Sequence, residues 1–142
     1  MKFLSNSQLP KHVTSERGST AVEFALFLPL LVVLVFGMID FGLLIWQKEV
    51  LVNATREGAR QGILFGAGNG KPEIATAVAQ AISDGGLDAS GLNIKVTGVG
   101  TGVGNPLAVT SSLPFQFIVA DKLIPGISRN TLTASITMMN EG

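Results

Sequence analysis

The sequence predicts an α+β fold in which one long membrane-spanning helix precedes a small domain, with a second helix on a three- to four-stranded antiparallel sheet. The first observation is an apolar stretch from Phe24 to Trp46 that contains one formally charged residue, Asp40. At about 1.5 Å of rise per residue the stretch is about 34 Å long, enough for a hydrocarbon core of about 30 Å. The second observation is the alternation of apolar and polar residues in the C-terminal third, which is typical of half-buried strands.

The apolar stretch divides the chain into a leader at 1–18, a transmembrane and assembly helix at 19–66, and a domain at 67–142. The leader is polar, contains Pro10 and shows no apolar periodicity. We expect the helix to begin near Ser19 or Thr20, because a hydroxyl group can cap it there and Glu23 then lies close to the positive end of the helix dipole. The rest of the 142-residue chain is long enough for one small domain.

The predicted helix continues well beyond the membrane, where Glu57 and Arg60 have the spacing of an exposed ion pair. Small residues recur there at every fourth position: Ala54, Gly58, Gly62 and Gly66. This spacing puts Gly58 and Gly62 on one face, where another backbone can approach closely. The alternative is that the last glycines only fray the helix, because an interior glycine costs about 1 kcal/mol relative to alanine. The glycine-rich residues 66–70 then end the helix.

A second helix is predicted from Pro72, which suits a first helical turn, to the Gly85-Gly86 pair that stops it. Its apolar face should lie on the sheet. The apolar positions of this helix are Ile74, Val78 and Ile82; those of the strands are Leu92, Ile94 and Val96, then Leu107 and Val109 continued by Phe115, Phe117 and Val119, and finally Leu132, Ala134, Ile136 and Met138. Residues 98–104, between the first two strands, are rich in glycine and are predicted to be a mobile connection.

Composition and motifs exclude several classes of function. Ten basic and ten acidic residues give a net charge of zero, so no long-range field attracts nucleic acid. The chain has no cysteine, and its one histidine, His12, lacks the partners that a metal site or a catalytic triad needs. Gly70-Lys71 resembles the end of a P-loop, but Phe65 and Pro72 replace residues that this motif requires. We therefore expect no metal, no cofactor, no nucleic-acid partner and no enzymatic activity.

Asp40 stands near the end of the apolar stretch. A carboxylate in such a position faces protein, water or the membrane interface rather than lipid. If the span ends at Ile39, Asp40 is simply interfacial, and Gly37 and Gly42 favour this interpretation because they mark the fading end of the apolar core. Pro29 either kinks the helix or is tolerated where neighbouring helices and local unwinding satisfy the freed carbonyl.

A secretory signal peptide is the competing interpretation of the apolar stretch. Such a peptide has a short apolar region followed closely by an Ala-x-Ala-like cleavage site. Here the apolar region is long, and the nearest approximation to the site is Val52-Asn53-Ala54, which fits poorly. Basic residues lie on both sides of the span, so the distribution of positive charge leaves the orientation open.

Four segments carry motifs that belong together. They are Arg-Gly-Ser-Thr-Ala-Val-Glu-Phe-Ala-Leu-Phe-Leu-Pro at 17–29, Ile-Asp-Phe-Gly at 39–42, Ala-Thr-Arg-Glu-Gly-Ala-Arg at 54–60, and the alternating Leu132 to Glu141. This combination resembles the TadE-like family of minor pilins, or pseudopilins, of tight-adherence pilus systems. The resemblance covers most of residues 17–66 and the last strand. The predicted domain is larger than that of the major pilins of these systems, which favours a minor subunit or an assembly factor.

The resemblance implies a pilin-like fold and cleavage of the Gly18–Ser19 bond by a membrane aspartyl prepilin peptidase. Glu23 would become the fifth mature residue, and the domain would be exported from the bacterial inner membrane while the leader faces the cytoplasm. The ammonium group freed at Ser19 would pair with Glu23 of a neighbouring subunit, because an unpaired charge in an apolar bundle is costly. The candidate assembly residues are Glu23, Phe24, Asp40, Gly58 and Gly62.

The partners implied by this resemblance are the prepilin peptidase, other pilins and pseudopilins that pack on the N-terminal helix, the inner-membrane pilus assembly platform, and membrane lipid. Two alternatives stay open. One is a signal-anchored envelope protein that keeps its leader and uses its glycine-rich domain for binding. The other is a pseudopilin of a secretion system, cleaved at the same bond but with different partners.

Overall fold

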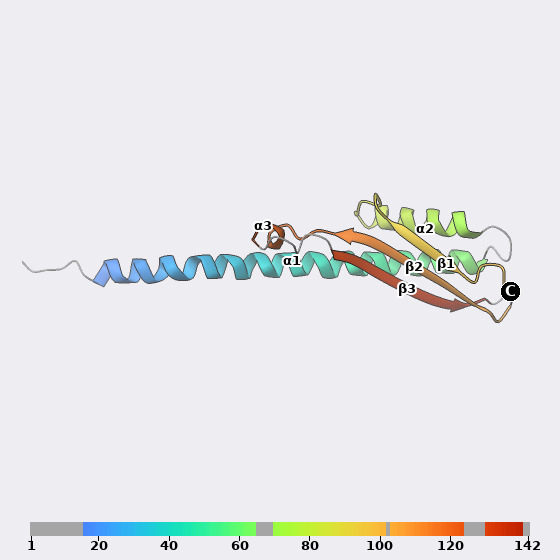
Figure 1. Ribbon diagram of the computed structural model, residues 1–142, viewed down its shortest axis with the longest axis horizontal. Helices are drawn as coiled ribbons and strands as arrows, with labels where there is room; N and C mark the ends of the chain where they lie inside the picture. Colours follow the sequence, from blue (N-terminus) through green and yellow to red (C-terminus); the bar gives the residue numbers. More distant parts are fainter. Residues whose placement is uncertain (1–15, 65–69, 102, 124–129, 141–142) are drawn as a thin grey trace, which may run out of the picture. The chain divides into compact units, whose positions relative to one another are not determined.

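The computed structural model describes residues 16–64, 70–101, 103–123 and 130–140. The elements are α1 (Glu16–Leu64), α2 (Gly70–Asp84), β1 (Asn93–Thr97), β2 (Pro106–Phe115), α3 (Ala120–Leu123) and β3 (Asn130–Met139), as Figure 1 shows. Contacts divide the chain into two units, Met1–Val35 and Phe36–Gly142. The α+β class, the long apolar helix, the second helix and a three-stranded antiparallel sheet are all confirmed.

Helix α1 begins at Glu16, before the start predicted at Ser19 or Thr20. The difference arises because Gly18 is tolerated within the first turn: glycine lowers helix stability by about 1 kcal/mol relative to alanine but does not forbid a helix. The helix also continues through Pro29. The predicted end of the assembly helix at Gly66 stays a prediction, because residues 65–69 lie outside the described part of the chain, as do residues 1–15 of the leader. The predicted end of the leader at Gly18 is a cleavage point and also stays a prediction.

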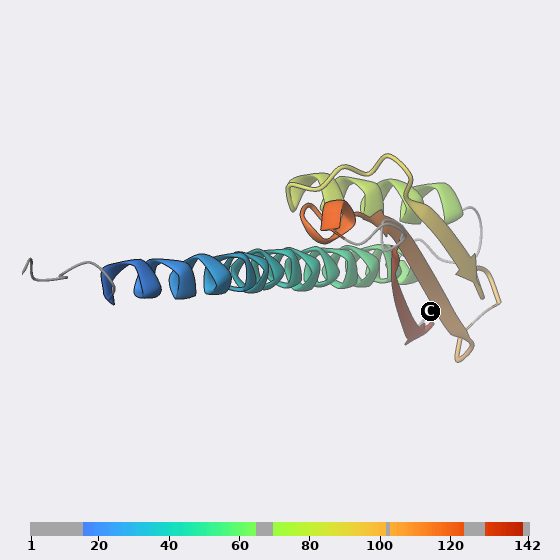
Figure 2. The same ribbon diagram turned by 60° about the vertical axis from the view of Figure 1, so that its left-hand side comes forward.

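The core of the second unit lies between α2, the C-terminal part of α1 and one face of the sheet (Figure 2). The predicted apolar face of α2 is confirmed, since Ile74, Val78 and Ile82 are all completely buried. The other buried apolar members of this core are Leu51, Ala54, Ala59, Leu107, Val109, Leu113 and Ala134. Residues from α1, from α2 and from the sheet are thus removed from water together, which is the main favourable term in folding.

The sheet has the order β1-β2-β3, with both pairings antiparallel. Val109 of the central strand lies opposite Val96 on one side and Ile136 on the other. Alternate residues of β2, from Leu107 to Phe115, are buried, whereas those between them are half-buried or exposed. Strand β3 follows the predicted alternation, since its threonine and serine positions are exposed. Each strand therefore presents one apolar face to the helices.

The second strand ends at Phe115, so the prediction that Phe117 and Val119 continue it is wrong. Pro114 remains within the strand, opposite Thr131 of β3. After Phe115 the chain leaves the sheet and enters α3, a helix of one turn that the sequence analysis did not predict. The physical reason is a set of hydrogen bonds from the backbone of this segment to Asp40, described below.

Two loops are held by specific turns. Gly98 has a φ of +87°, and a Cβ there would lie 2.1 Å from the carbonyl oxygen of Pro106, so the β1–β2 connection requires glycine at this position. The amide of Gly104 donates to the carbonyl of Asn140 at 2.8 Å. Before β1, the Ser90 hydroxyl and its backbone N–H both donate to the Asp88 carboxylate, the latter at 2.8 Å, and they lower the pKa of Asp88 below its ordinary value.

Candidate functional site

The predicted cleavage bond, Gly18–Ser19, lies in the first turns of α1, and both residues are exposed. A Cβ built on Gly18 would meet nothing within 4 Å. The bond is therefore accessible from the surface of the chain. A methyl group can also be added at Gly18 without disturbing any contact of the fold.

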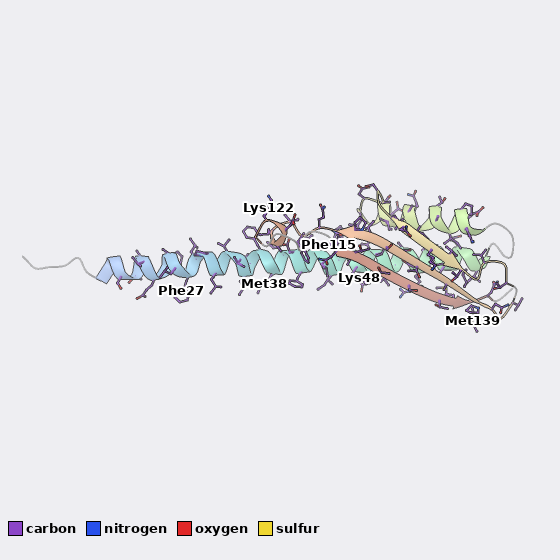
Figure 3. The ribbon with its side chains drawn as sticks, in the orientation of Figure 1. Phe27, Met38, Lys48, Phe115, Lys122 and Met139 are labelled. Carbon is purple, nitrogen blue, oxygen red and sulfur yellow. The ribbon has the colours of Figure 1, made fainter. Side chains whose placement is uncertain are left out.

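The next candidates, Glu23 and Phe24, are also exposed, with 66 % of the Phe24 surface accessible. Ser19 and Glu23 are four residues apart and so share one face of the helix. Within the described residues, α1 between Gly18 and Ile63 is the one helix long and apolar enough to cross a membrane. Its exposed large side chains in the first unit, among which Figure 3 labels Phe27, are Val22, Phe24, Leu26, Phe27, Leu28, Leu30, Leu31, Val32, Val33, Leu34 and Val35.

Asp40 is buried, with 2 % of its surface accessible, and binds the segment that follows β2. Its Oδ1 accepts the backbone N–H of Ile118 at 3.1 Å, and its Oδ2 accepts those of Val119 at 3.1 Å and Ala120 at 2.9 Å. The sequence left protein, water and the membrane interface open as surroundings of this carboxylate. The structure shows that its hydrogen-bond partners are protein backbone groups. The carboxylate accepts hydrogen bonds from N–H groups at the start of α3, and so both caps this helix and binds it to α1.

Aromatic side chains reinforce the attachment made by Asp40. Phe117 packs edge-on against Phe41 of α1, with ring centroids 6.5 Å apart, and against Phe115 at the end of β2, with centroids 4.8 Å apart. Both arrangements are close to the T-shaped geometry that aromatic pairs prefer. The segment after β2 is thus held to the sheet as well as to α1.

Gly58 and Gly62 are buried where α1 passes α2, and the second backbone that approaches them belongs to the same chain. A Cβ on Gly58 would lie 2.2 Å from Val78 Cγ2 and 3.3 Å from the Ile74 carbonyl oxygen. A Cβ on Gly62 would lie 2.6 Å from Ile74 Cδ1 and 2.8 Å from Leu107 Cδ2. A contact of these glycines with another subunit stays a prediction, and it would require α2 to move away.

Two further contacts complete this part of α1. Glu57 and Arg60 form the predicted ion pair, with 3.3 Å between Oε2 and Nε. Lys48, at the end of the apolar stretch, donates a hydrogen bond to the carbonyl of Thr133 in the edge strand β3. This bond joins α1 to the edge strand of the described sheet. Lys48 and Thr133 are 85 positions apart and share no motif, so no signal in the sequence predicts this contact.

The described residues contain no group of three or more His, Cys, Asp or Glu side chains that could hold a metal ion. His12 and Glu141 lie outside the described part of the chain. The candidate site therefore consists of three parts of one helix. They are the exposed Gly18–Ser19 junction with Glu23, the attachment at Asp40, and the glycine face, formed by Gly58 and Gly62, against which α2 packs.

A comparison with known families supports the identification made from the sequence. The family model described as TadE-like protein matches residues 18–60. The match begins at the predicted cleavage junction and ends at Arg60, so it includes every candidate site residue except Gly62. Comparisons with curated proteins and with solved structures found no match.

Proposed function

Because this chain is TadE-like over residues 18–60, we propose that it is a minor pilin or pseudopilin of a tight-adherence pilus, processed at Gly18–Ser19 and assembled through α1. The carrying observation is the surface of α1 from Val22 to Val35, where large apolar side chains are exposed. An apolar surface of this extent needs lipid or protein around it. Membrane lipid before assembly and neighbouring pilin helices after assembly would both provide such surroundings.

The same proposal sets the location of each part. The leader would face the cytoplasm, α1 would span the bacterial inner membrane, and the sheet with α2 would lie on the outer side. The peptidase would hydrolyse the amide bond of Gly18, leaving a carboxylate on Gly18 and an ammonium group on Ser19. The leader would depart, and the remaining chain would be a building block recognised by the assembly platform and by other pilins.

Glu23 is proposed as the partner of the new ammonium group in a neighbouring subunit. Its side chain is exposed and lies on the same helical face as Ser19. In an apolar bundle the two charges would neutralise one another, which would set the register between adjacent helices.

A Gly18→Ala substitution is expected to block maturation, because the proposed peptidase cuts after this glycine. It should leave the fold intact, because the added methyl group meets nothing within 4 Å. The measurement is the intact mass and N-terminal sequence of membrane-extracted protein, with and without a co-expressed prepilin peptidase. The matched control is Gly42→Ala, which also adds a methyl group in open space on α1 and should be processed normally. The unsubstituted chain should begin at Ser19 only when the peptidase is present.

Retention of residues 1–18 in the unsubstituted chain under both conditions would contradict the proposed cleavage. That result would favour the signal-anchored envelope protein instead. Normal processing of the Gly18→Ala protein would show that the peptidase does not require this glycine.

A Glu23→Ala substitution is expected to leave cleavage largely intact and to lower incorporation into pili several-fold, because the ammonium group at Ser19 loses its partner. Incorporation is measured by quantifying the chain in sheared pilus fractions. Glu49→Ala is the matched control, since it removes another exposed carboxylate from α1. Equal incorporation of both variants would limit Glu23 to a favourable interaction with the helix dipole.

A further inference from the structure

We infer that residues 117–122, called here the interfacial segment, form a second contact with the lipid bilayer beside α1. This inference rests on the proposed function, because it takes α1 as a membrane helix. It adds that the domain after the helix is seated on the membrane surface at a defined place.

The depth of Asp40 follows from the length of the helix that precedes it. If the hydrocarbon core begins at Phe24, a core of about 30 Å extends over about 20 residues, to about Leu43. Asp40 then lies about 24 Å from the start of the core and about 6 Å inside its far boundary. Trp46 lies just beyond this boundary, where tryptophan is enriched in membrane proteins.

A carboxylate at this depth requires hydrogen-bond donors that lipid tails do not have. The donors are the backbone N–H groups of Ile118, Val119 and Ala120 at 2.9–3.1 Å. These atoms belong to the interfacial segment, so the segment itself must lie at the depth of Asp40. The domain therefore reaches back along α1 to the level of the last apolar turns.

The exposed side chains at this level are suited to lipid. Phe41 and Ile118 are 62 % and 59 % exposed. Phe117 packs edge-on against both Phe41 of α1 and Phe115 of β2. Figure 3 labels Lys122 at the level of Met38 along α1. The interfacial segment also carries the charged Asp121 and Lys122, which favour the headgroup layer over the hydrocarbon core. This combination keeps the segment close to the boundary, within the depth of about 6 Å derived for Asp40.

The test measures the depth of Ile118 in a bilayer. Because the chain has no cysteine, Ile118→Cys gives a single labelling site for an environment-sensitive fluorophore. The full chain is reconstituted in phosphatidylcholine and phosphatidylglycerol vesicles with a nitroxide quencher on the lipid, either near the headgroup or near the end of the acyl chain. The expected result is strong loss of emission with the shallow quencher and a smaller loss with the deep one.

Two control sites bracket this result. Leu34→Cys labels an exposed position ten residues after Phe24, which should be quenched best by the deep nitroxide. Val103→Cys labels an apolar residue that is 72 % exposed in the loop at the other end of β2. Neither quencher should affect this site. Combining Ile118→Cys with Asp40→Ala should reduce the quenching by the shallow nitroxide.

The possible failures are distinguishable. If the label at 34 is quenched and the label at 118, like the label at 103, is not, then α1 spans the membrane but the inferred contact of the interfacial segment with lipid is overturned. If the label at 118 is unquenched and the unlabelled Ile118→Cys protein, treated with a thiol-specific cross-linker, is joined to a second copy of the chain, the patch is a contact between subunits and the inference is again overturned. If the label at 34 is also unquenched, the membrane helix of the proposed function fails, and the inference fails with it.

Discussion

Replacing Asp40 with alanine is expected to release residues 117–123 from α1. The substitution removes the acceptor of three backbone N–H groups at once. Each of these groups donates to an oxygen of Asp40 at 2.9–3.1 Å. These donors are partly buried, so without their acceptor they keep part of the cost of desolvation, and bonds to a carboxylate are stronger than those to neutral groups. A helix of one turn has little stability of its own, so α3 should unfold.

Hydrogen exchange of the full chain in detergent micelles measures this release. The amides of residues 118–120 should lose their protection, whereas those of the paired strands β1 and β2 should keep it. Trypsin should also cut faster after the exposed Lys122 than in the unsubstituted chain. Asp121→Ala is the matched control, because it removes a neighbouring carboxylate that caps none of these amides. Unchanged exchange at 118–120 in the Asp40→Ala protein would show that the aromatic contacts alone hold the segment.

A Gly58→Ala substitution is expected to lower the free energy of unfolding of the domain by up to about 2 kcal/mol. The added Cβ would lie 2.2 Å from Val78 Cγ2, closer than any real contact. Valine has one strongly preferred χ1 rotamer in a helix, so α2 must shift to relieve the overlap. Overpacking of this kind costs about 1–3 kcal/mol, and the better helix propensity of alanine offsets about 1 kcal/mol of it.

Chemical unfolding of the full chain in mild detergent, followed by circular dichroism, measures this change. Gly42→Ala on the same helix is the control with the opposite expectation, because its Cβ meets nothing within 4 Å and only the propensity gain remains. Adding Val78→Ala to Gly58→Ala removes the clashing methyl group. The double variant should therefore be more stable than the sum of the two single changes predicts. Additive losses would mean that Gly58 and Val78 are not the pair in conflict.

The segments predicted correctly have signals that are local in the sequence. The four-residue spacing of Ile74, Val78 and Ile82 determines the buried face of α2, because a helix brings such positions to one side. The alternation in 130–139 determines which face of β3 is covered. The glycine repeat indicated close approach by a second backbone, but it carried no information on which backbone would approach.

The sequence by itself therefore determined the apolar helix, the second helix, the sheet and the resemblance to the TadE-like family that the family model finds over residues 18–60. Only the tertiary structure decided the partners of Asp40, the end of β2 at Phe115, the presence of α3, and α2 as the occupant of the glycine face. The hydrogen-bond partners of Asp40 lie 78 to 80 residues further along the chain. No local periodicity can encode such a contact, because it depends on where folding brings two distant backbones together.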